Sequence, residues 1–312
     1  MNLVLVHLGD DNFPLYIFDN LRQIRRFYDG NIFVVVPNNI CRQHSAELYS
    51  FNCSIIATED LEGYEKNVNL ETITSDMKKT EQPSFNYLLD KGYWKYTLQR
   101  FLFLEALTKE LSLTDVIHVE NDVTIYEDLN QLENKLYQCY PKSIAINPVD
   151  PNHAAGAFIY YHGVESIGFL NDLFLEWIQK GEKQNIKELD VDMITEMNFL
   201  NHFQKIIPER VKYLPLLPEN HHFENTNIFN SVFDGASWGQ YVGGLPEIHA
   251  DQELRFFPKS WVGRELLQKK YTLVWKQDDL KRRIPYVLNM ETQKETKINN
   301  LHVHCKRFKD FI

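Results

Sequence analysis

Two acidic residues separated by one position form the most informative motif of this sequence. Glu120, Asn121 and Asp122 follow the apolar run Asp115–Val119, and a second β-rich run, Val123–Tyr126, comes next. Side chains two positions apart in an extended chain point to the same side, so both carboxylates can share one ligand. Carboxylate oxygens suit a hard divalent cation such as Mn²⁺ or Mg²⁺, which fills its other positions with water and substrate phosphates. The motif therefore predicts a metal site at a strand end.

A polar turn is the plain alternative for this motif, because Asn-Asp is common turn chemistry. The apolar residues on either side, Val119 and Val123, indicate a buried strand before and after the motif. Carboxylates held between such strands are costly unless a partner compensates their charge. The flanking residues therefore favour a functional role over a plain turn.

A second polar group lies near the C-terminus, where His302 and His304 alternate with Val303. In a strand both imidazoles would face the same side, and an imidazole nitrogen is a good ligand for Mn²⁺. Lys306, two positions further on, can bind a phosphate as a point charge. The spacing does not decide which histidine binds a metal, and an exposed polar strand is the alternative. A zinc site is disfavoured, since no third His or Cys lies at a recognisable spacing.

Alternating strands and helices must position these residues. The apolar periodicity predicts strands at 3–7, 32–36, 53–57, 115–119, 123–126, 144–146 and 157–161, and helices at 13–28, 42–49, 94–111, 164–180 and 192–204. Such alternation predicts an α/β fold with a parallel sheet and right-handed crossovers. The polar segment 59–86 is expected to be a loop. A last hairpin is expected to run through 285–288, turn at 291–294 and return through 298–304.

Composition excludes several function classes. The net charge of -10 argues against a non-specific nucleic-acid binder, whose affinity comes from Lys and Arg. The sequence has no run of about 18 apolar residues, so no transmembrane segment is expected. The four cysteines are scattered, which suits free thiols in a reducing compartment, and a cytoplasmic location is expected. They are Cys41, Cys53, Cys139 and Cys305.

The order of these features resembles nucleotide-diphospho-sugar glycosyltransferases of the GT-A fold. The resemblance implies one α/β domain over 1–312, with a Rossmann-like, mixed, mostly parallel sheet flanked by helices. Residues 1–125 would be the nucleotide-sugar-binding half, and 126–312 the acceptor-binding half with a C-terminal metal and phosphate tail. Glu120-Asn121-Asp122 would be an E-x-D variant of the family's D-x-D motif. Asp122 would then be the main ligand of Mn²⁺ or Mg²⁺, while Glu120 would meet the metal through water or hold the donor ribose.

The same resemblance implies roles for further residues, with a UDP-sugar as the favoured donor and a glycan or other hydroxyl compound as the acceptor. His302 or His304 would complete the metal site, and Lys306 would meet the diphosphate. Residues expected to contact the donor are His7, Gly9, Asp10, Arg100, Glu120 and Asn121. Residues expected to contact the acceptor are Asn152 and Gly156 in the segment 152–157, and Trp238, Gln240 and Tyr241 in a Gly-rich aromatic segment. If the enzyme inverts the anomeric centre, Asp192 or Asp234 is the expected base.

Structural alternatives stay open for several of these residues. Gly9-Asp10 also reads as an ordinary turn, Arg100 as a surface ion pair, Asp192 as a helix cap and 233–244 as a tight packed turn. The sequence also leaves two other functions open. A sugar-phosphate nucleotidyltransferase should carry a Gly-rich, basic loop after its first strand, where this chain has HLGDDNFP. An inactive glycan- or nucleotide-sugar-binding relative would not need the metal motif intact.

Overall fold

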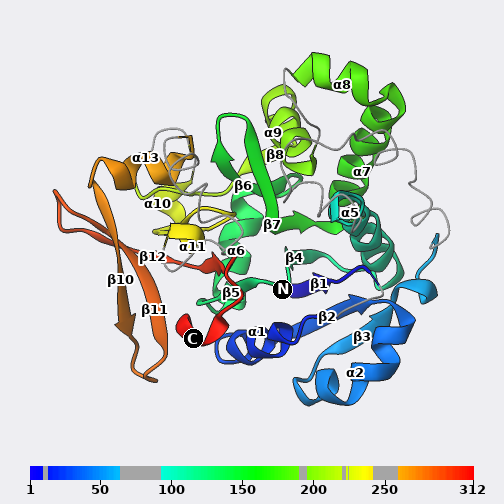
Figure 1. The fold of residues 1–312 in the computed structure, drawn as a ribbon, viewed down its shortest axis with the longest axis horizontal. Coiled ribbons are helices and arrows are strands. Elements are labelled where there is room, and N and C mark those ends of the chain that lie inside the picture. The colour runs from blue at the N-terminus through cyan, green and yellow to red at the C-terminus, as the bar shows by residue number, and fades with distance from the viewer. Residues whose placement is uncertain (10–12, 64–92, 190–194, 220–222, 224, 242–258) are drawn as a thin grey trace.

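A seven-stranded sheet forms the centre of the computed structural model, which describes residues 1–9, 13–63, 93–189, 195–219, 223, 225–241 and 259–312. Its strand order is β3-β2-β1-β4-β7-β6-β8 (Figure 1). Six strands run in one direction, and β7 runs antiparallel to its neighbours β4 and β6. The expected mixed, mostly parallel α/β sheet is therefore confirmed. The strands are β1 (Asn2–Val6), β2 (Asn31–Val36), β3 (Ser54–Ala57), β4 (Asp115–Val119), β6 (Ile144–Asp150), β7 (His153–His162) and β8 (Val211–Tyr213).

Helices cover both faces of this sheet, because its strands are apolar on both sides. In β1, Leu3 and Leu5 pack into one core cluster, whereas Val4 and Val6 pack into another. The first cluster includes side chains of α1 (Tyr16–Arg25), α2 (Asn38–Ser50) and α6 (Leu129–Cys139). The second includes side chains of α5 (Tyr93–Glu110), α7 (Gly163–Lys180) and α9 (Glu196–Ile206), and α8 (Glu182–Leu189) follows α7 along the chain.

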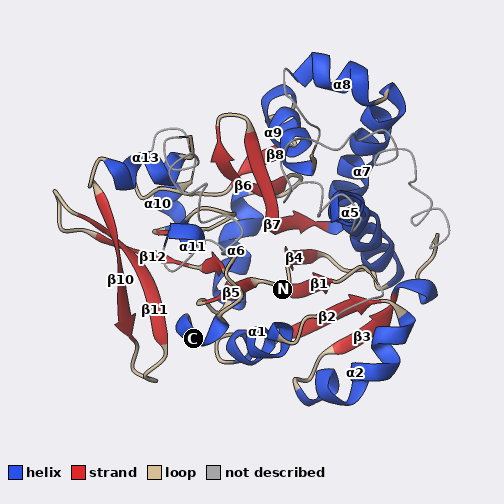
Figure 2. Cartoon of the chain, in the orientation of Figure 1, coloured by secondary structure: helices blue, strands red, loops and turns tan. Residues whose placement is uncertain are grey.

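A four-stranded sheet of order β10-β11-β12-β9 lies at one side of the molecule, away from α2 and α8 (Figure 2). A third core cluster packs against it and includes Phe308 and Phe311 of the C-terminal segment. The strands are β9 (Ser231–Val232), β10 (Tyr271–Gln277), β11 (Arg283–Asn289) and β12 (Glu295–Ile298). The described residues also form the short helices η1 (Thr58–Asp60), α10 (Thr226–Phe229), α11 (Trp238–Tyr241), α13 (Trp261–Leu267) and η3 (Phe308–Asp310).

A two-stranded ribbon joins distant parts of the chain. In it, β5 (Val123–Ile125) pairs antiparallel with β13 (Asn300–His302). The sequence predicts one returning strand over 298–304, but the chain divides at Asn299 into β12 and β13, which join different sheets. This division matters for function, because it moves the C-terminal histidines from the second sheet to the end of β4.

Two predicted helices begin at other residues in the structure than the sequence indicates. The helix expected at 42–49 begins already at Asn38, directly after the N-cap residue Pro37. The helix expected from 192 begins at Glu196 with a capping box between Thr195 and Asn198. Most of the expected loop 59–86 lies outside the described residues. All four cysteines are free thiols. Among the described helices, none combines the length and the apolar character that crossing a bilayer requires.

Candidate active site

The acidic motif forms a turn that carries the chain from the central sheet into the ribbon. The backbone N–H of Val123 donates to the carbonyl of Glu120 at 3.0 Å, and the N–H of Glu120 donates to Ala157 of β7 at 2.9 Å. The buried side chain of Asn20 in α1 donates to the carbonyls of Asn121 and Val123, both at 2.9 Å. The motif is thus a turn, as the alternative expected, but its Asp122 is buried. The turn lies at the carboxyl end of a central strand, where open α/β sheets bind ligands.

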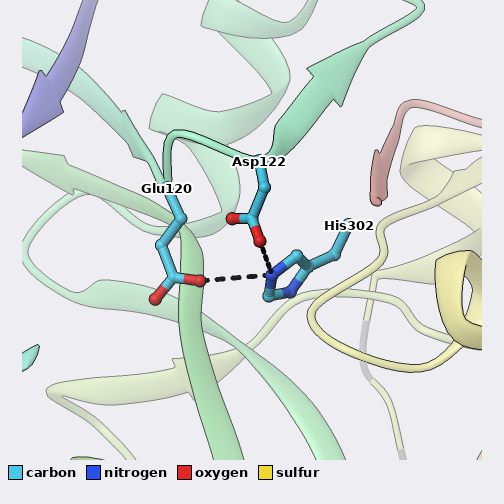
Figure 3. A group of neighbouring side chains, drawn as sticks. All are labelled: Glu120, Asp122 and His302. Atoms are coloured by element: carbon cyan, nitrogen blue, oxygen red, sulfur yellow. Dashed lines mark ion pairs between the residues drawn. The ribbon is translucent and has the colours of Figure 1, made fainter. Parts of the chain in front are cut away.

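The ribbon brings the C-terminal histidine to this turn. His302 pairs with Val123 across the ribbon, and the N–H of Val303 donates to the carbonyl of Asp122 at 2.8 Å. The Nε2 atom of His302 lies 3.1 Å from Oδ2 of Asp122 and 3.4 Å from Oε2 of Glu120. Figure 3 shows both carboxylates directed at this one ring nitrogen. Glu120 and Asp122 therefore meet His302, although they lie 182 and 180 positions before it in the sequence.

These three residues form a group that can hold a metal ion. One ligand atom from each lies within 4.8 Å of the others, and Asp122 and His302 are buried. The Nδ1 atom of His302 lies 2.6 Å from the carbonyl of Gly235, which makes Nδ1 the protonated nitrogen and leaves the Nε2 lone pair for a cation. Two carboxylates and one imidazole fit Mn²⁺ or Mg²⁺. His302 belongs to this group. The ring of His304 stacks on the ring of His302, with the two ring centroids 3.9 Å apart.

Arg100 of α5 compensates the negative charge of two carboxylates at the site, those of Glu120 and Glu196. Its guanidinium forms an ion pair with Glu120 and lies 3.5 Å from Glu196 at the start of α9. Gly156 in β7 makes room for it, because a Cβ there would lie 2.6 Å from Nη2 of Arg100. Although burial raises the pKa of the Glu120 carboxyl, the charge of Arg100 is the largest opposing effect, and the pKa falls to about 2. Burial raises the pKa of Glu196 despite the opposing charge of Arg100.

Lys306 approaches the motif from the C-terminal side. Its ammonium forms an ion pair with Asp122 and lies 5.6 Å from the ring centroid of Tyr16. Desolvation lowers the pKa of this ammonium to about 8, while the charge of Glu120 opposes the shift. The side chain therefore stays cationic at neutral pH. It stands beside the metal-binding group, where it can meet an anionic group of a ligand.

The end of β1 supplies a neutral histidine next to the motif. The Nδ1 atom of His7 lies 3.3 Å from Nδ2 of Asn121, and its ring packs edge-on against Phe13. Burial lowers the pKa of His7 to about 4, so the imidazole is neutral at pH 7. Gly9 has φ +110°, and a Cβ there would touch Tyr96 at 3.3 Å. Asp10 lies outside the described residues.

Asp234 is fully buried and surrounded by backbone donors. Its Oδ1 accepts from the N–H groups of Ser237 and Trp238, and its Oδ2 from those of Gly239 and His302, all at 2.8 to 2.9 Å. Burial raises the pKa of Asp234, and these hydrogen bonds oppose the shift. A general base needs an oxygen that is open to substrate, so this environment fits a positioning role better than the expected catalytic one.

The expected acceptor residues are spread over different environments. The Trp238 indole is fully buried and donates to the carbonyl of Leu216 at 3.0 Å, so it packs the core and presents no open face for a sugar. Gln240 is half-buried in α11, and the side chain of Tyr241 lies outside the described part. Asn152 is exposed in the turn before β7. Most of the segment 152–157 lies within β7, which begins earlier than the strand predicted at 157–161. Asp192 lies outside the described residues.

Sequence reasoning missed Asn20, Glu196 and Gly235. Asn20 leaves a signal, because it is a polar residue among the apolar positions that α1 buries. Glu196 reads as an ordinary acidic residue in the first turn of a helix. Gly235 contributes a backbone carbonyl, which residue type does not reveal.

No protein-family model matches the sequence, and comparison with curated proteins gives no match either. Among solved structures, apo mouse xyloside xylosyltransferase 1 is similar over 69% of this chain and 84% of its own, with 12% identity and a TM-score of 0.45. The PaToxG glycosyltransferase is similar over 66% and 69%, with 15% identity and a TM-score of 0.41. A cytidylyltransferase from Leptospira borgpetersenii is similar over 55% and 63%, with 10% identity and a TM-score of 0.32. Glycosyltransferases and a cytidylyltransferase are thus among the structures that are similar to this chain. No residue role is transferred from these proteins.

Proposed function

We propose that this protein is a metal-dependent glycosyltransferase that moves a sugar from a nucleotide-diphosphate donor to a glycan or other hydroxyl acceptor. The main support is the meeting of Glu120 and Asp122 with His302 at the carboxyl end of β4, with ligand atoms within 4.8 Å. A group of two carboxylates and an imidazole beside a lysine suits a cation that is shared with a diphosphate. The division into a nucleotide half, 1–125, and an acceptor half, 126–312, is part of the same proposal.

Asp122 and His302 are the principal ligands in this proposal. Glu120 shares its charge with Arg100, so its carboxylate is only partly available to a cation. A divalent ion held there supplies Lewis-acid stabilisation of the negative charge on the departing nucleoside diphosphate. Lys306 adds a second positive charge on the Asp122 side, where a diphosphate oxygen can replace the carboxylate as its partner.

His7, Gly9, Asp10 and Asn121 are proposed to hold the nucleoside, with UDP as the favoured carrier. His7 is neutral at pH 7, so it recognises a base by hydrogen bonding and not by charge. Gly9 leaves space beside Tyr96 at the end of β1. Asn152, Gly156, Gln240 and Tyr241 remain proposed acceptor contacts, and Asp192 remains the proposed base of an inverting reaction. A cytoplasmic location is likewise part of the proposal.

The direct test is a thermal-shift screen of UDP, GDP, CMP and dTDP compounds with and without Mn²⁺. A ligand at 100 times its Kd stabilises the native state by about 2.7 kcal/mol. We expect one nucleotide to stabilise the wild type only with Mn²⁺, and Asp122→Ala to remove that effect. Arg22→Ala is a matched control, because Arg22 forms an exposed ion pair with Asp19. Absence of any shift at millimolar nucleotide would reject the transferase proposal in favour of a glycan-binding role.

A further inference from the structure

We propose that Asp234 is a positioning residue that sets the place and the tautomer of His302, the metal ligand from β13. This inference rests on the proposed metal-dependent function, and it replaces the catalytic role that the sequence suggested for Asp234. The carboxylate of Asp234 accepts the backbone N–H of His302 and is not one of the three residues of the metal-binding group. It therefore acts on the metal through His302.

The first contact is made through the backbone of His302. Oδ2 of Asp234 accepts the N–H of His302 at 2.9 Å and the N–H of Gly239 at 2.8 Å. The same carboxylate binds two further N–H groups through Oδ1, so it ties β13 to the start of α11. Asn300 reinforces the connection through two hydrogen bonds with the backbone of Asp234. The Asn300 side-chain amide donates to the carbonyl of Asp234 at 2.6 Å, and its oxygen accepts the N–H of Asp234 at 3.2 Å.

The second contact is made through the imidazole of His302. Gly235, the residue after Asp234, offers its carbonyl to Nδ1 of His302 at 2.6 Å. With Nδ1 occupied by this contact, Nε2 is the ring nitrogen that can bind a cation, and it is directed at Asp122 and Glu120. Both the strand position and the ring tautomer of His302 therefore depend on one short segment, residues 234–235.

Steric fit locks this segment against its surroundings. A Cβ on Gly235 would lie 2.4 Å from Cβ of Asn147 in β6, so the backbone is seated directly on the central sheet. A Cβ on Gly239 would lie 2.0 Å from the carbonyl oxygen of His302. Because real Cβ atoms do not approach other atoms so closely, both positions require glycine. The segment has little freedom to shift while the carboxylate of Asp234 is in place.

The test uses Asp234→Asn, which keeps the size of the side chain but turns an amide N–H₂ toward backbone donors. Mn²⁺ binding is measured on the whole protein by electron paramagnetic resonance of the free ion, without donor or acceptor. Loss of an outer partner of a metal-bound histidine weakens metal affinity about 10- to 100-fold, and we expect a loss in that range. Thr108→Val is the matched control. Thr108 is buried in helix α5, where it makes hydrogen bonds to Leu104 and Tyr161. It should lose stability and keep the Mn²⁺ affinity of the wild type.

Wild-type Mn²⁺ affinity in folded Asp234→Asn would overturn this inference while leaving the proposed function standing. Absence of Mn²⁺ binding by the wild type would instead reject the proposed metal site, and this inference with it. If circular dichroism shows that Asp234→Asn does not fold, the ¹⁵N shifts of the wild-type imidazole decide, with His302→Gln to assign the signals. A proton on Nδ1 supports the inference, because the carbonyl of Gly235 can only accept, and an unprotonated Nδ1 overturns it.

Discussion

Removal of the Arg100 cation gives a quantitative test of how the acidic site is held together. In Arg100→Met, two carboxylates lose the guanidinium that lies between them, those of Glu120 and Glu196. The three side chains are 7%, 17% and 5% exposed for Arg100, Glu120 and Glu196, so water compensates the lost charge poorly. Breaking a buried ion pair by removing one partner costs about 3–5 kcal/mol, and we expect a loss of that size in the free energy of unfolding.

The second carboxylate makes a double-mutant cycle informative. Glu196→Gln alone should cost only about 1 kcal/mol, because the Arg100–Glu120 pair stays in place and the contact to Glu196 is long, at 3.5 Å. In Arg100→Met combined with Glu196→Gln, one of the two unpaired charges is gone. The double variant should therefore be more stable than the sum of the single effects predicts, by about 0.5–3 kcal/mol.

Urea unfolding at pH 7 in EDTA, followed by tryptophan fluorescence, measures these values. Arg22→Met is the control, since its ion pair with Asp19 is exposed and should contribute at most about 1 kcal/mol. A loss below about 1 kcal/mol in Arg100→Met would refute the reasoning. So would single effects that add within about 0.5 kcal/mol, because they would show that Arg100 does not link the two carboxylates.

Two further predictions concern the neighbours of the site. The pKa of His7 is about 4 in the folded protein, against 6.5 for an ordinary histidine. The unfolded chain therefore takes up the proton first as the pH falls, and stability is lost between these two values. From pH 7 to pH 4 the loss in the free energy of unfolding amounts to about 3 kcal/mol. Urea unfolding of His7→Gln should show a correspondingly smaller loss over the same pH range. An equal loss in both proteins would contradict the prediction. Gly156→Ala places a Cβ 2.6 Å from Nη2 of Arg100 and should destabilise by about 1–3 kcal/mol. The control Gly168→Ala, whose Cβ meets the flexible end of Glu105 at 3.0 Å within helix α7, should be neutral or stabilising, so equal effects would count against the steric account.

Local patterns in the sequence predict much of the fold. The apolar runs at 32–36 and 115–119 are buried on both faces, and they became β2 and β4 of the central sheet. The division of the last strand at Asn299 was not predicted, because it depends on which distant strand each half meets. β12 pairs with β11 and β9, whereas β13 pairs with β5, and tertiary packing determines which strands pair.

The candidate site was predictable to the extent that residue types reveal chemistry. The spacing of Glu120 and Asp122, and the pair His302 and His304, indicated ligands without deciding between the two histidines, and the structure brings His302 to both carboxylates. Burial is harder to infer, because an aspartate and a tryptophan look equally suited to a ligand pocket or to a core. Asp234 and Trp238 were both expected at a substrate site, and both are fully buried. Their roles depend on backbone groups, which carry no signal in residue type.

The most direct test of the proposed function is a titration of the wild type and Asp122→Asn with Mn²⁺, in the absence and in the presence of the nucleoside diphosphate that the screen identifies. If the cation and the diphosphate share the site at Asp122 and His302, each must tighten binding of the other by the same factor. We predict that the wild type binds Mn²⁺ at least about 5-fold more tightly with the diphosphate present, and that Asp122→Asn loses this coupling. Equal Mn²⁺ affinity with and without the diphosphate, or unchanged coupling in Asp122→Asn, would contradict a metal-assisted transferase at this site.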